Sequence, residues 1–331
     1  MKATNSKART FVRELTSDSY SLERCRRLQL SAPRVRNGAD EGEVAGLPGY
    51  TEGQKAAWRV GPGDDPFLTQ TLQVHMVDVP ARGQAEGHGH QNEAAFYILS
   101  GRGYEIHDDL RYDWKAGDLV FVHTDSVHQH FNPYDEPART VVFKAKSTWM
   151  FLGLLQQGKS GPIDRPAEFG EREDWSKVWT PGVLSRKKVI GEADAAWRDT
   201  ELGRIRTLCS PEQTDARMFS VDVVEILIAP NSHSGKYWKM ADEVLFVLEG
   251  SGYALMWEVA ADIDEKYHAR IAKTPSRHDI GGEDTLYIPQ NHVCQLFSGD
   301  GTPLRLLSAQ NRIFKHLGYD KVHLFEAASS A

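Results

Sequence analysis

The sequence predicts an all-β protein in which an N-terminal arm is followed by two tandem barrels. From about residue 68 onward, short runs rich in Val, Ile, Phe and Tyr alternate with Gly, Asp and Pro, which is typical of antiparallel barrels and sandwiches. Several of these runs occur twice in the same order. We therefore interpret the second half of the chain as a diverged copy of the first.

Three pairs of segments carry this internal repeat. The segment AAWR at 56–59 recurs at 195–198, and FYILSGRGY at 96–104 recurs as LFVLEGSGY at 245–253. The third pair is SVHQHF at 126–131 and HVCQLF at 292–297. The offset between the copies grows along the chain, which places insertions in the loops of the second copy.

These patterns divide the chain into four regions. Residues 1–50 form an arm, in which helical spacing over residues 10–30 is followed by a segment broken by Pro and Gly. Residues 51–147 form the first barrel, and residues 195–331 form the second barrel and a C-terminal tail. Residues 148–194 are expected to be a linker with short helices.

Composition limits the class of protein. The 331 residues, 40% of them hydrophobic, are enough to bury two cores. A formal net charge of −7 provides no basic field for nucleic acid, so neither DNA nor RNA is an expected partner. There is no apolar run long enough for a bilayer and no recognisable signal peptide, so no membrane partner is expected. Three cysteines without CxxC spacing favour a reducing compartment, and the cytoplasm is the expected location.

Closely spaced histidines form a candidate metal site in the first copy. His88 and His90 are two residues apart, so on a strand both imidazoles project from the same face, as two ligands of one ion must. A turn glycine, Gly101, follows at the spacing of a metal-binding barrel motif. A second motif begins at Gly117 and contains His128.

These motifs, their separation and the internal repeat resemble the bicupin branch of the cupin superfamily over about residues 55–310. The expected fold is two tandem cupin barrels, which are jelly rolls of the double-stranded β-helix type, with an N-terminal helical arm. The first copy is similar to gentisate and salicylate 1,2-dioxygenases, in which a His-x-His segment without a glutamate ligand precedes a His-x-His-x-Asn segment, here 128–132. The resemblance implies His88, His90 and His128 as ligands of Fe(II) or another divalent metal.

The glutamate that commonly serves as a further cupin ligand lacks an obvious counterpart. Counting from His88 and His90, inward-facing residues are even-numbered, which puts Ala94 at the usual glutamate position and turns Glu93 outward. A β-bulge would turn Glu93 inward. A site with Glu93 as a fourth ligand therefore stays open as an alternative.

Further residues are candidates for the surroundings of the metal. His130 shares a strand face with His128, and we interpret it as the catalytic residue, acting as a hydrogen-bond donor or proton shuttle, with a structural role as the alternative. His107 is a weaker candidate. Four residues are expected in the substrate pocket, with core packing or a strand-end position as the alternative for each: Phe96, Ile98, Tyr104 and His123.

The second copy is expected to lack a metal. Tyr237 and Lys239 occupy the first two histidine positions, Cys294 occupies the third, and Glu243 stands at the glutamate position. A carboxylate and a thiol without any histidine form a poor iron site. Lys239 and Glu243 are instead expected to form an ion pair.

The resemblance implies a non-haem Fe(II) dioxygenase that cleaves the ring of a hydroxylated aromatic, with a small aromatic substrate and dioxygen as partners. Gentisate-type enzymes carry an arginine at the position of Phe96 that meets the substrate carboxylate. Three kinds of substrate therefore stay open as alternatives: a neutral phenol, an amino- or nitro-substituted aromatic, and an aromatic acid whose carboxylate is bound by another residue. The alternatives are a metal-dependent cupin lyase, decarboxylase or hydrolase, or a non-enzymatic small-molecule-binding cupin. Because bicupin enzymes are homo-oligomers, a homodimer or homotetramer is expected.

Overall fold

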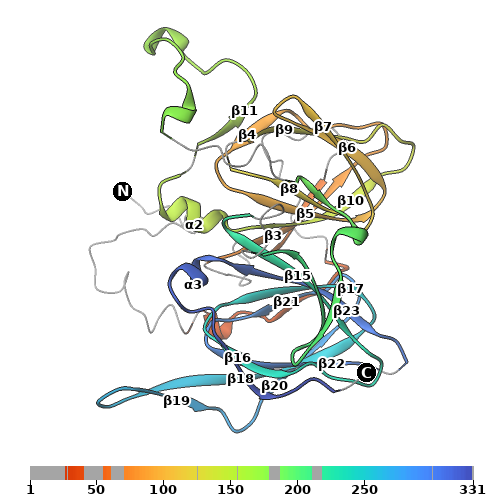
Figure 1. The fold of residues 1–331 in the computed structure, drawn as a ribbon, viewed down its shortest axis with the longest axis vertical. Helices are drawn as coiled ribbons and strands as arrows, with labels where there is room; N and C mark the ends of the chain where they lie inside the picture. The colour runs from red at the N-terminus through yellow and green to blue at the C-terminus, as the bar shows by residue number, and fades with distance from the viewer. Residues whose placement is uncertain are drawn as a thin grey trace.

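The fold is that of a computed structural model, which describes residue 27 and residues 29–40, 55–60, 71–124, 126–154, 156–178, 187–210, 218–299 and 301–329. Most of the N-terminal arm, including the greater part of the helix expected at 10–30, lies outside these residues. Figure 1 shows two β-barrels, one above the other, as expected from the repeat. The prediction of an all-β fold with two tandem barrels is confirmed.

The first barrel consists of two sheets. The six-stranded sheet has the order β12-β8-β5-β10-β3-β2 and the five-stranded sheet has the order β11-β4-β9-β6-β7. The strands of the first sheet are β2 (Lys55–Val60), β3 (Gln73–Val79), β5 (Ala94–Ser100), β8 (Leu119–Val122), β10 (Ala138–Lys144) and β12 (Val189–Ile190). Those of the second are β4 (His88–His90), β6 (Arg102–His107), β7 (Leu110–Lys115), β9 (Ser126–Phe131) and β11 (Gln157–Lys159).

The second barrel repeats this plan. Its larger sheet has the order β1-β21-β17-β23-β15-β14-β13, and its other sheet has the order β19-β18-β22-β16-β24, with β20 paired to β18. The larger sheet contains β1 (Val35–Arg36), β13 (Trp197–Thr200), β14 (Gly203–Cys209), β15 (Val221–Ile228), β17 (Glu243–Glu249), β21 (Thr285–Ile288) and β23 (Leu304–Asn311). The other contains β16 (Lys236–Lys239), β18 (Gly252–Ile263), β19 (Tyr267–Ile271), β20 (Ser276–Ile280), β22 (His292–Ser298) and β24 (Val322–Glu326).

The two barrels correspond strand by strand. The central orders β8-β5-β10-β3 and β21-β17-β23-β15 are equivalent, and so are β4-β9-β6 and β16-β22-β18. The sequence repeat therefore reflects a repeat of topology. One barrel supplies the histidine strands β4 and β9, and the other supplies their counterparts β16 and β22.

Segments outside the repeated strands complete the sheets of both barrels. From the linker, β11 pairs with β4 and β12 pairs with β8. From the arm, β1 pairs with β21, and from the C-terminal segment, β24 pairs with β16. The helices whose bounds lie within the described residues are α2 (Lys146–Phe151), η2 (Pro166–Glu168), η3 (Trp175–Lys177), η4 (Glu192–Asp194) and α3 (Ile313–His316). The four paired strands β1, β11, β12 and β24 cover sheet edges that would otherwise expose unpaired backbone N–H and C=O groups.

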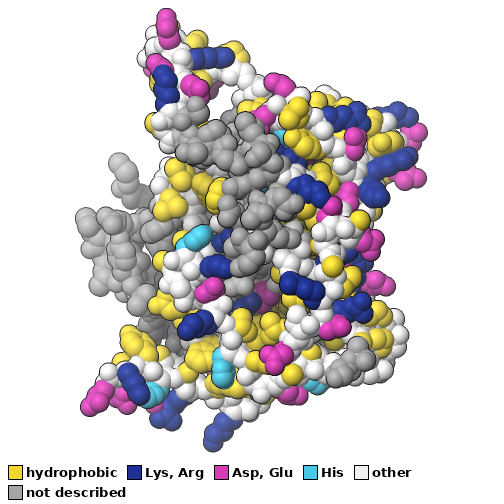
Figure 2. All heavy atoms as spheres, viewed as in Figure 1, with side chains coloured by type: hydrophobic (Ala, Val, Ile, Leu, Met, Phe, Trp, Pro, Cys, Tyr) yellow, Lys and Arg dark blue, Asp and Glu magenta, His cyan; other side chains and the backbone are white. Residues whose placement is uncertain are grey.

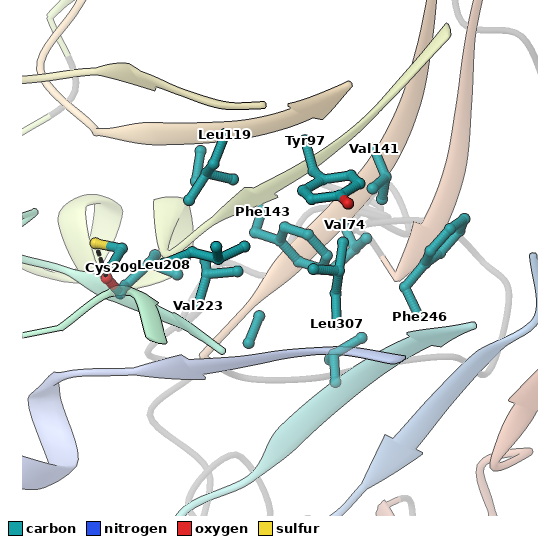
Figure 3. Packing of buried hydrophobic residues seen from close by; sticks show 14 of the residues in the cluster. Val74, Tyr97, Leu119, Val141, Phe143, Leu208, Cys209, Val223, Phe246 and Leu307 are labelled. Carbon is teal, nitrogen blue, oxygen red and sulfur yellow. Dashed lines mark hydrogen bonds between the residues drawn. The ribbon is translucent and has the colours of Figure 1, made fainter. Parts of the chain in front are cut away.

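A shared hydrophobic core joins the two barrels. Figure 3 shows side chains of the first barrel, including Tyr97 and Phe143, pointing toward side chains of the second, including Phe246 and Leu307. All belong to one buried cluster that draws on both larger sheets. Because burial of apolar area is the main favourable term in packing, this cluster holds the barrels together.

The surface shows no sign of a basic face on the side drawn in Figure 2. There, among the described residues, Lys and Arg side chains are intermixed with Asp and Glu side chains over both barrels. Within the described part of the chain, no helix combines the length and apolar character that crossing a bilayer requires.

Replacing Phe143 by Ala should destabilise the protein, because the ring is fully buried between the barrels. We expect the free energy of unfolding to fall by about 3–5 kcal/mol, as for other buried phenylalanines. Phe169→Ala is the matched control, since Phe169 is 59% exposed, and it should change stability by less than about 0.5 kcal/mol. Denaturant unfolding measures both, and equal effects would contradict a shared core.

Candidate metal centre

The three histidines predicted as ligands lie together on two paired strands of the first barrel. In the antiparallel pair β4 and β9, His88 is directly opposite His128. The ring centroids are 5.6 Å apart for His88 and His90, 4.3 Å for His88 and His128, and 4.9 Å for His90 and His128. One ligand atom from each residue lies within 4.8 Å of the others. The cluster can therefore hold one metal ion.

Backbone carbonyls orient all three imidazoles in the same way. The Nδ1 atoms of His88, His90 and His128 lie 2.8, 2.5 and 3.2 Å from the carbonyl oxygens of Glu86, Asn92 and Ser126, respectively. A carbonyl can only accept, so each Nδ1 carries the proton and each Nε2 keeps its lone pair. Among the described residues, the buried Nε2 atoms of His90 and His128 have no hydrogen-bond partner. These nitrogen atoms, whose lone pairs are free of hydrogen bonds, are suited to bind a metal ion.

Burial keeps the three imidazoles neutral. It lowers the pKa of His88 to about 4 and the pKa values of His90 and His128 well below the usual range, and neighbouring positive charges add to the effect. Only a neutral imidazole can donate a lone pair to a metal. The cluster is therefore in its binding form at neutral pH.

Glu93 lies outside the cluster, in the orientation that strand parity predicts. Its Oε2 accepts three hydrogen bonds of 2.8 Å, from the backbone N–H groups of Phe219 and Ser220 and from the Ser220 hydroxyl. The carboxyl group is fully buried between the barrels. Ala94 instead belongs to the interior of the first barrel. Glu93 is thus engaged by the second barrel, away from the metal cluster.

Glu105 is a buried carboxylate that was not predicted from the sequence. It contacts two imidazoles that lie beside the candidate ligands. Its Oε2 lies 2.8 Å from Nδ1 of His130, and its Oε1 lies 2.5 Å from Nε2 of His107. Although burial raises the pKa of Glu105, His107 and His130 lower it to about 2. His107 in turn stacks on His128, with centroids 5.4 Å apart. Glu105 is therefore ionised and fixes two imidazoles beside the candidate ligands.

The sequence pattern that could have indicated Glu105 is its position two residues before His107, because both then share one face of a strand. The register pairs Glu105 with His130 and His107 with His128, so both residues of β6 face the interior. A glutamate in a strand is usually solvent-exposed, and only this pairing shows that it is not.

Phe96 and Ile98 line the barrel interior, as expected, but they pack closely there. Phe96 lies 4.7 Å from His130 between ring centroids. The cavity that Phe96, Ile98, Glu105 and His130 border has a volume of only about 10 Å³, which is room for one water at most. This part of the barrel interior is therefore closely packed and has no space for a small molecule larger than water.

The structure corrects the expected positions of Tyr104 and His123. Tyr104 lies on the outer face of β6, where its ring stacks on Phe131 at 4.8 Å and the Arg111 guanidinium lies 3.8 Å from its centroid. The turn at Gly101 changes the strand phase, so inward residues are even-numbered on β5 and odd-numbered on β6. His123 lies apart from the histidine cluster, and its Nδ1 lies 3.0 Å from the buried Nζ of Lys188.

A cleft of about 1120 Å³ opens beside His90. It is lined by residues of the neighbouring strands β11, β4 and β9 and of the loop that follows β11. The lining residues include His90, Thr124, Ser126, Gln156, Lys159 and Trp175. The linker thus lines a cleft that His90 borders.

At the equivalent position of the second barrel there is an ion pair. Lys239 Nζ lies 2.6 Å from Oε2 of Glu243, and the Tyr237 hydroxyl donates to the same oxygen at 2.8 Å. Burial raises the pKa of the Cys294 thiol, so the sulfur stays protonated. Among the described residues, the histidines of the first barrel are the only group with metal-ligand spacing.

Comparison with known proteins agrees with this architecture. Residues 75–144 match the family model of the cupin domain, and no curated protein matches the chain. The solved structure of a salicylate 1,2-dioxygenase from Pseudaminobacter salicylatoxidans has a TM-score of 0.65 at 14% identity, covering 88% of each chain. A point variant of this enzyme in complex with gentisate has a TM-score of 0.62 at 13% identity, covering 88% of this chain and 86% of that chain.

A different enzyme shares the fold as well. A structure of oxalate decarboxylase has a TM-score of 0.57 at 12% identity, covering 84% of this chain and 77% of that chain. Likeness at such low identity establishes the architecture and leaves the reaction to be argued from the site. Residues 75–144 are therefore similar to the cupin domain, and the two-barrel architecture of the chain resembles that of salicylate 1,2-dioxygenase.

Proposed function

We propose that the protein is a non-haem Fe(II) dioxygenase that cleaves the ring of a hydroxylated aromatic compound. The observation that carries this proposal is the buried cluster of His88, His90 and His128, which contains no carboxylate because Glu93 is engaged by the second barrel. The proposal takes the reaction class from salicylate 1,2-dioxygenase, which shares the two-barrel architecture and which the histidine motifs of the first barrel resemble.

His88, His90 and His128 would hold the metal through their Nε2 atoms. Three neutral ligands preserve the positive charge of the ion and leave coordination positions open for small molecules. Ferrous iron bound there would supply the redox chemistry that joins dioxygen to a hydroxylated ring. Imidazole also suits other divalent metals, so the choice of iron rests on the resemblance.

His130 is proposed to handle a proton of the substrate. Its Nδ1 lies beside the ionised Glu105, so this nitrogen donates and Nε2 is left to accept. Carboxylates orient catalytic imidazoles in this way in other enzymes. Phe96, packed against His130, restricts how far this ring can turn.

Replacing His128 by Ala should abolish metal binding and leave the fold intact, because the barrel closes through strand pairing and core burial. Metal analysis of anaerobically purified protein should give about one ion per chain for the wild type and almost none for the variant. Glu93→Gln is the control and should retain the metal. A full complement of metal in His128→Ala would falsify the ligand assignment.

The protein should bind a single metal per chain, because Tyr237, Lys239 and Cys294 replace the three histidines in the second barrel. Metal content measured against protein concentration tests this stoichiometry. Cys294→Ala should leave it unchanged. A value near two, reduced by Cys294→Ala, would show that the second barrel also binds a metal.

Iron-loaded protein should consume dioxygen with at least one compound from a panel of catechols, salicylates, gentisates and aminophenols. His130→Ala should lower kcat by about 10²–10⁴-fold, the usual contribution of a general acid or base, and should keep its iron. An oxygen electrode with parallel iron analysis measures both. No uptake with any compound by fully loaded protein would rule out the proposed reaction.

A further inference from the structure

The loop between β4 and β5 connects the histidine cluster to the second barrel. It spans residues 91–93, and all of its residues are buried. The carbonyl oxygen of Asn92 lies 2.5 Å from Nδ1 of His90. The next residue, Glu93, accepts hydrogen bonds from the second barrel, among them that of the Ser220 hydroxyl at 2.8 Å. One short loop therefore joins a candidate metal ligand to a contact between the barrels.

The connection runs through a single peptide group. The carbonyl of Asn92 and the N–H of Glu93 belong to the same peptide unit, which is planar and resists twisting. The Cα atom of Glu93 lies in this plane, so fixing Glu93 limits the directions in which the carbonyl can point. That carbonyl holds the proton of His90 on Nδ1 and leaves Nε2 for a metal. The position of Glu93 therefore bears directly on the orientation of His90.

The linker fixes the other end of the loop. The N–H of Gln91 donates to the carbonyl of Gln156 at 3.0 Å, and the N–H of Gln156 donates to Oε1 of Gln91 at 2.9 Å. Asn92 lies between this contact and Glu93, so its carbonyl is held from both sides. Loss of the Glu93 contact would leave the loop attached through Gln91, and the Asn92 carbonyl would be less well fixed.

The carbonyls that hold the two other candidate ligands belong to the strands of the first barrel and their flanks. Glu86, which contacts His88, lies just before β4, and Ser126, which contacts His128, is the first residue of β9. Their positions follow from the pairing of β4 with β9. A change at Glu93 should therefore affect His90 more than His88 or His128.

The second barrel has an equivalent contact, which provides an internal control. In the register of the sequence repeat, Glu93 corresponds to Asp242. Oδ1 of Asp242 accepts a hydrogen bond of 2.5 Å from the hydroxyl of Thr71. Thr71 and Ser220 precede the equivalent strands β3 and β15, and both carboxylates are fully buried. The barrels thus exchange two similar contacts, of which that of Glu93 leads to the histidine cluster.

We propose that Glu93 is a positioning residue through which the second barrel fixes the orientation of His90 and so strengthens metal binding by the histidine cluster. A buried carboxylate is costly to desolvate, so hydrogen bonds to it do more to fix its position than to stabilise the fold. The inference rests on the proposed function for the metal. It adds a role for the barrel that has no histidine at the three ligand positions.

The test compares Glu93→Ala with Asp242→Ala, because each removes one of the two equivalent carboxylates. The Fe(II) affinity of the full-length protein is measured without oxygen, by competition with a coloured chelator. Glu93→Ala should weaken Fe(II) binding by about 10–100-fold, as for other groups that hold metal ligands in place. Asp242→Ala should leave the affinity unchanged. Glu93→Gln should keep most of the affinity, because its amide oxygen can accept the same hydrogen bonds.

An equal loss of affinity in both alanine variants would overturn the proposal, because it would reflect a general loosening of the two barrels. An unchanged affinity in Glu93→Ala, or an equal loss in Glu93→Gln, would overturn it as well. If Glu93→Ala does not fold, Ser220→Ala and Thr71→Val replace the pair, because each removes the donor hydroxyl of one contact. Ser220→Ala should then weaken Fe(II) binding more than Thr71→Val, and equal affinities would contradict the proposal.

A second measurement needs no metal. In NMR spectra of isotopically labelled histidine nitrogens, His90 of the metal-free wild type should carry its proton on Nδ1. In Glu93→Ala this signal should change to that of a mixture of tautomers, whereas the signals of His88 and His128 should stay the same. His90→Gln assigns the signal. An unchanged tautomer of His90 in Glu93→Ala would contradict the proposed role of Glu93.

These outcomes are separable from the dioxygenase proposal, because neither measurement involves oxygen. Fe(II) affinity that depends on Glu93, in a protein that consumes no oxygen with any aromatic compound, would support the inference and contradict the reaction. Oxygen consumption by a protein whose Fe(II) affinity does not depend on Glu93 would do the reverse. If the wild type binds no Fe(II), the ligand assignment fails, and the tautomer of His90 still decides whether Glu93 orients it.

Discussion

The antiparallel pairing of β4 with β9 is the constraint on which the metal cluster depends. It sets His88 opposite His128, and a slip of one residue would turn the histidines of one strand to the outer face. The pairing of β9 with β6 on its other edge then brings Glu105 to His130 and His107 to His128. The candidate ligands and the groups that contact them are therefore positioned by one sheet register.

The contact between the barrels and the composition of the cluster are linked through Glu93. In the second barrel, Glu243 stands at the glutamate position that Ala94 occupies in the first, and it is held by Lys239, Tyr237 and the Ser308 hydroxyl. In the first barrel, the preceding residue Glu93 points the other way and accepts hydrogen bonds from the second barrel. The first barrel thus has the three histidines without the inward glutamate, and the second has the inward glutamate without a histidine at those three positions.

Much of the fold and the ligand cluster could be predicted from the sequence, because spacing along a strand determines which side chains share a face. That rule identified the histidine cluster and the outward turn of Glu93. It failed for Tyr104, because the turn at Gly101 shifts the phase between two strands, and a shift of this kind leaves no periodic signal. Glu105 was missed for another reason. Its environment comes from strand partners distant in sequence, which periodicity alone does not show.

The strands supplied by the linker affect how the protein can be synthesised. Because β12 pairs with β8, and Lys188 beside it reaches His123, the first barrel is incomplete until residues well beyond its last repeated strand have left the ribosome. In the second barrel the order is reversed. Strand β1 is synthesised early, but it cannot pair until its partner β21 has been synthesised. Such non-local pairings slow folding. The nascent chain must therefore hold an unfinished barrel edge in solution during translation, and chaperones that shield exposed strands would act at that stage.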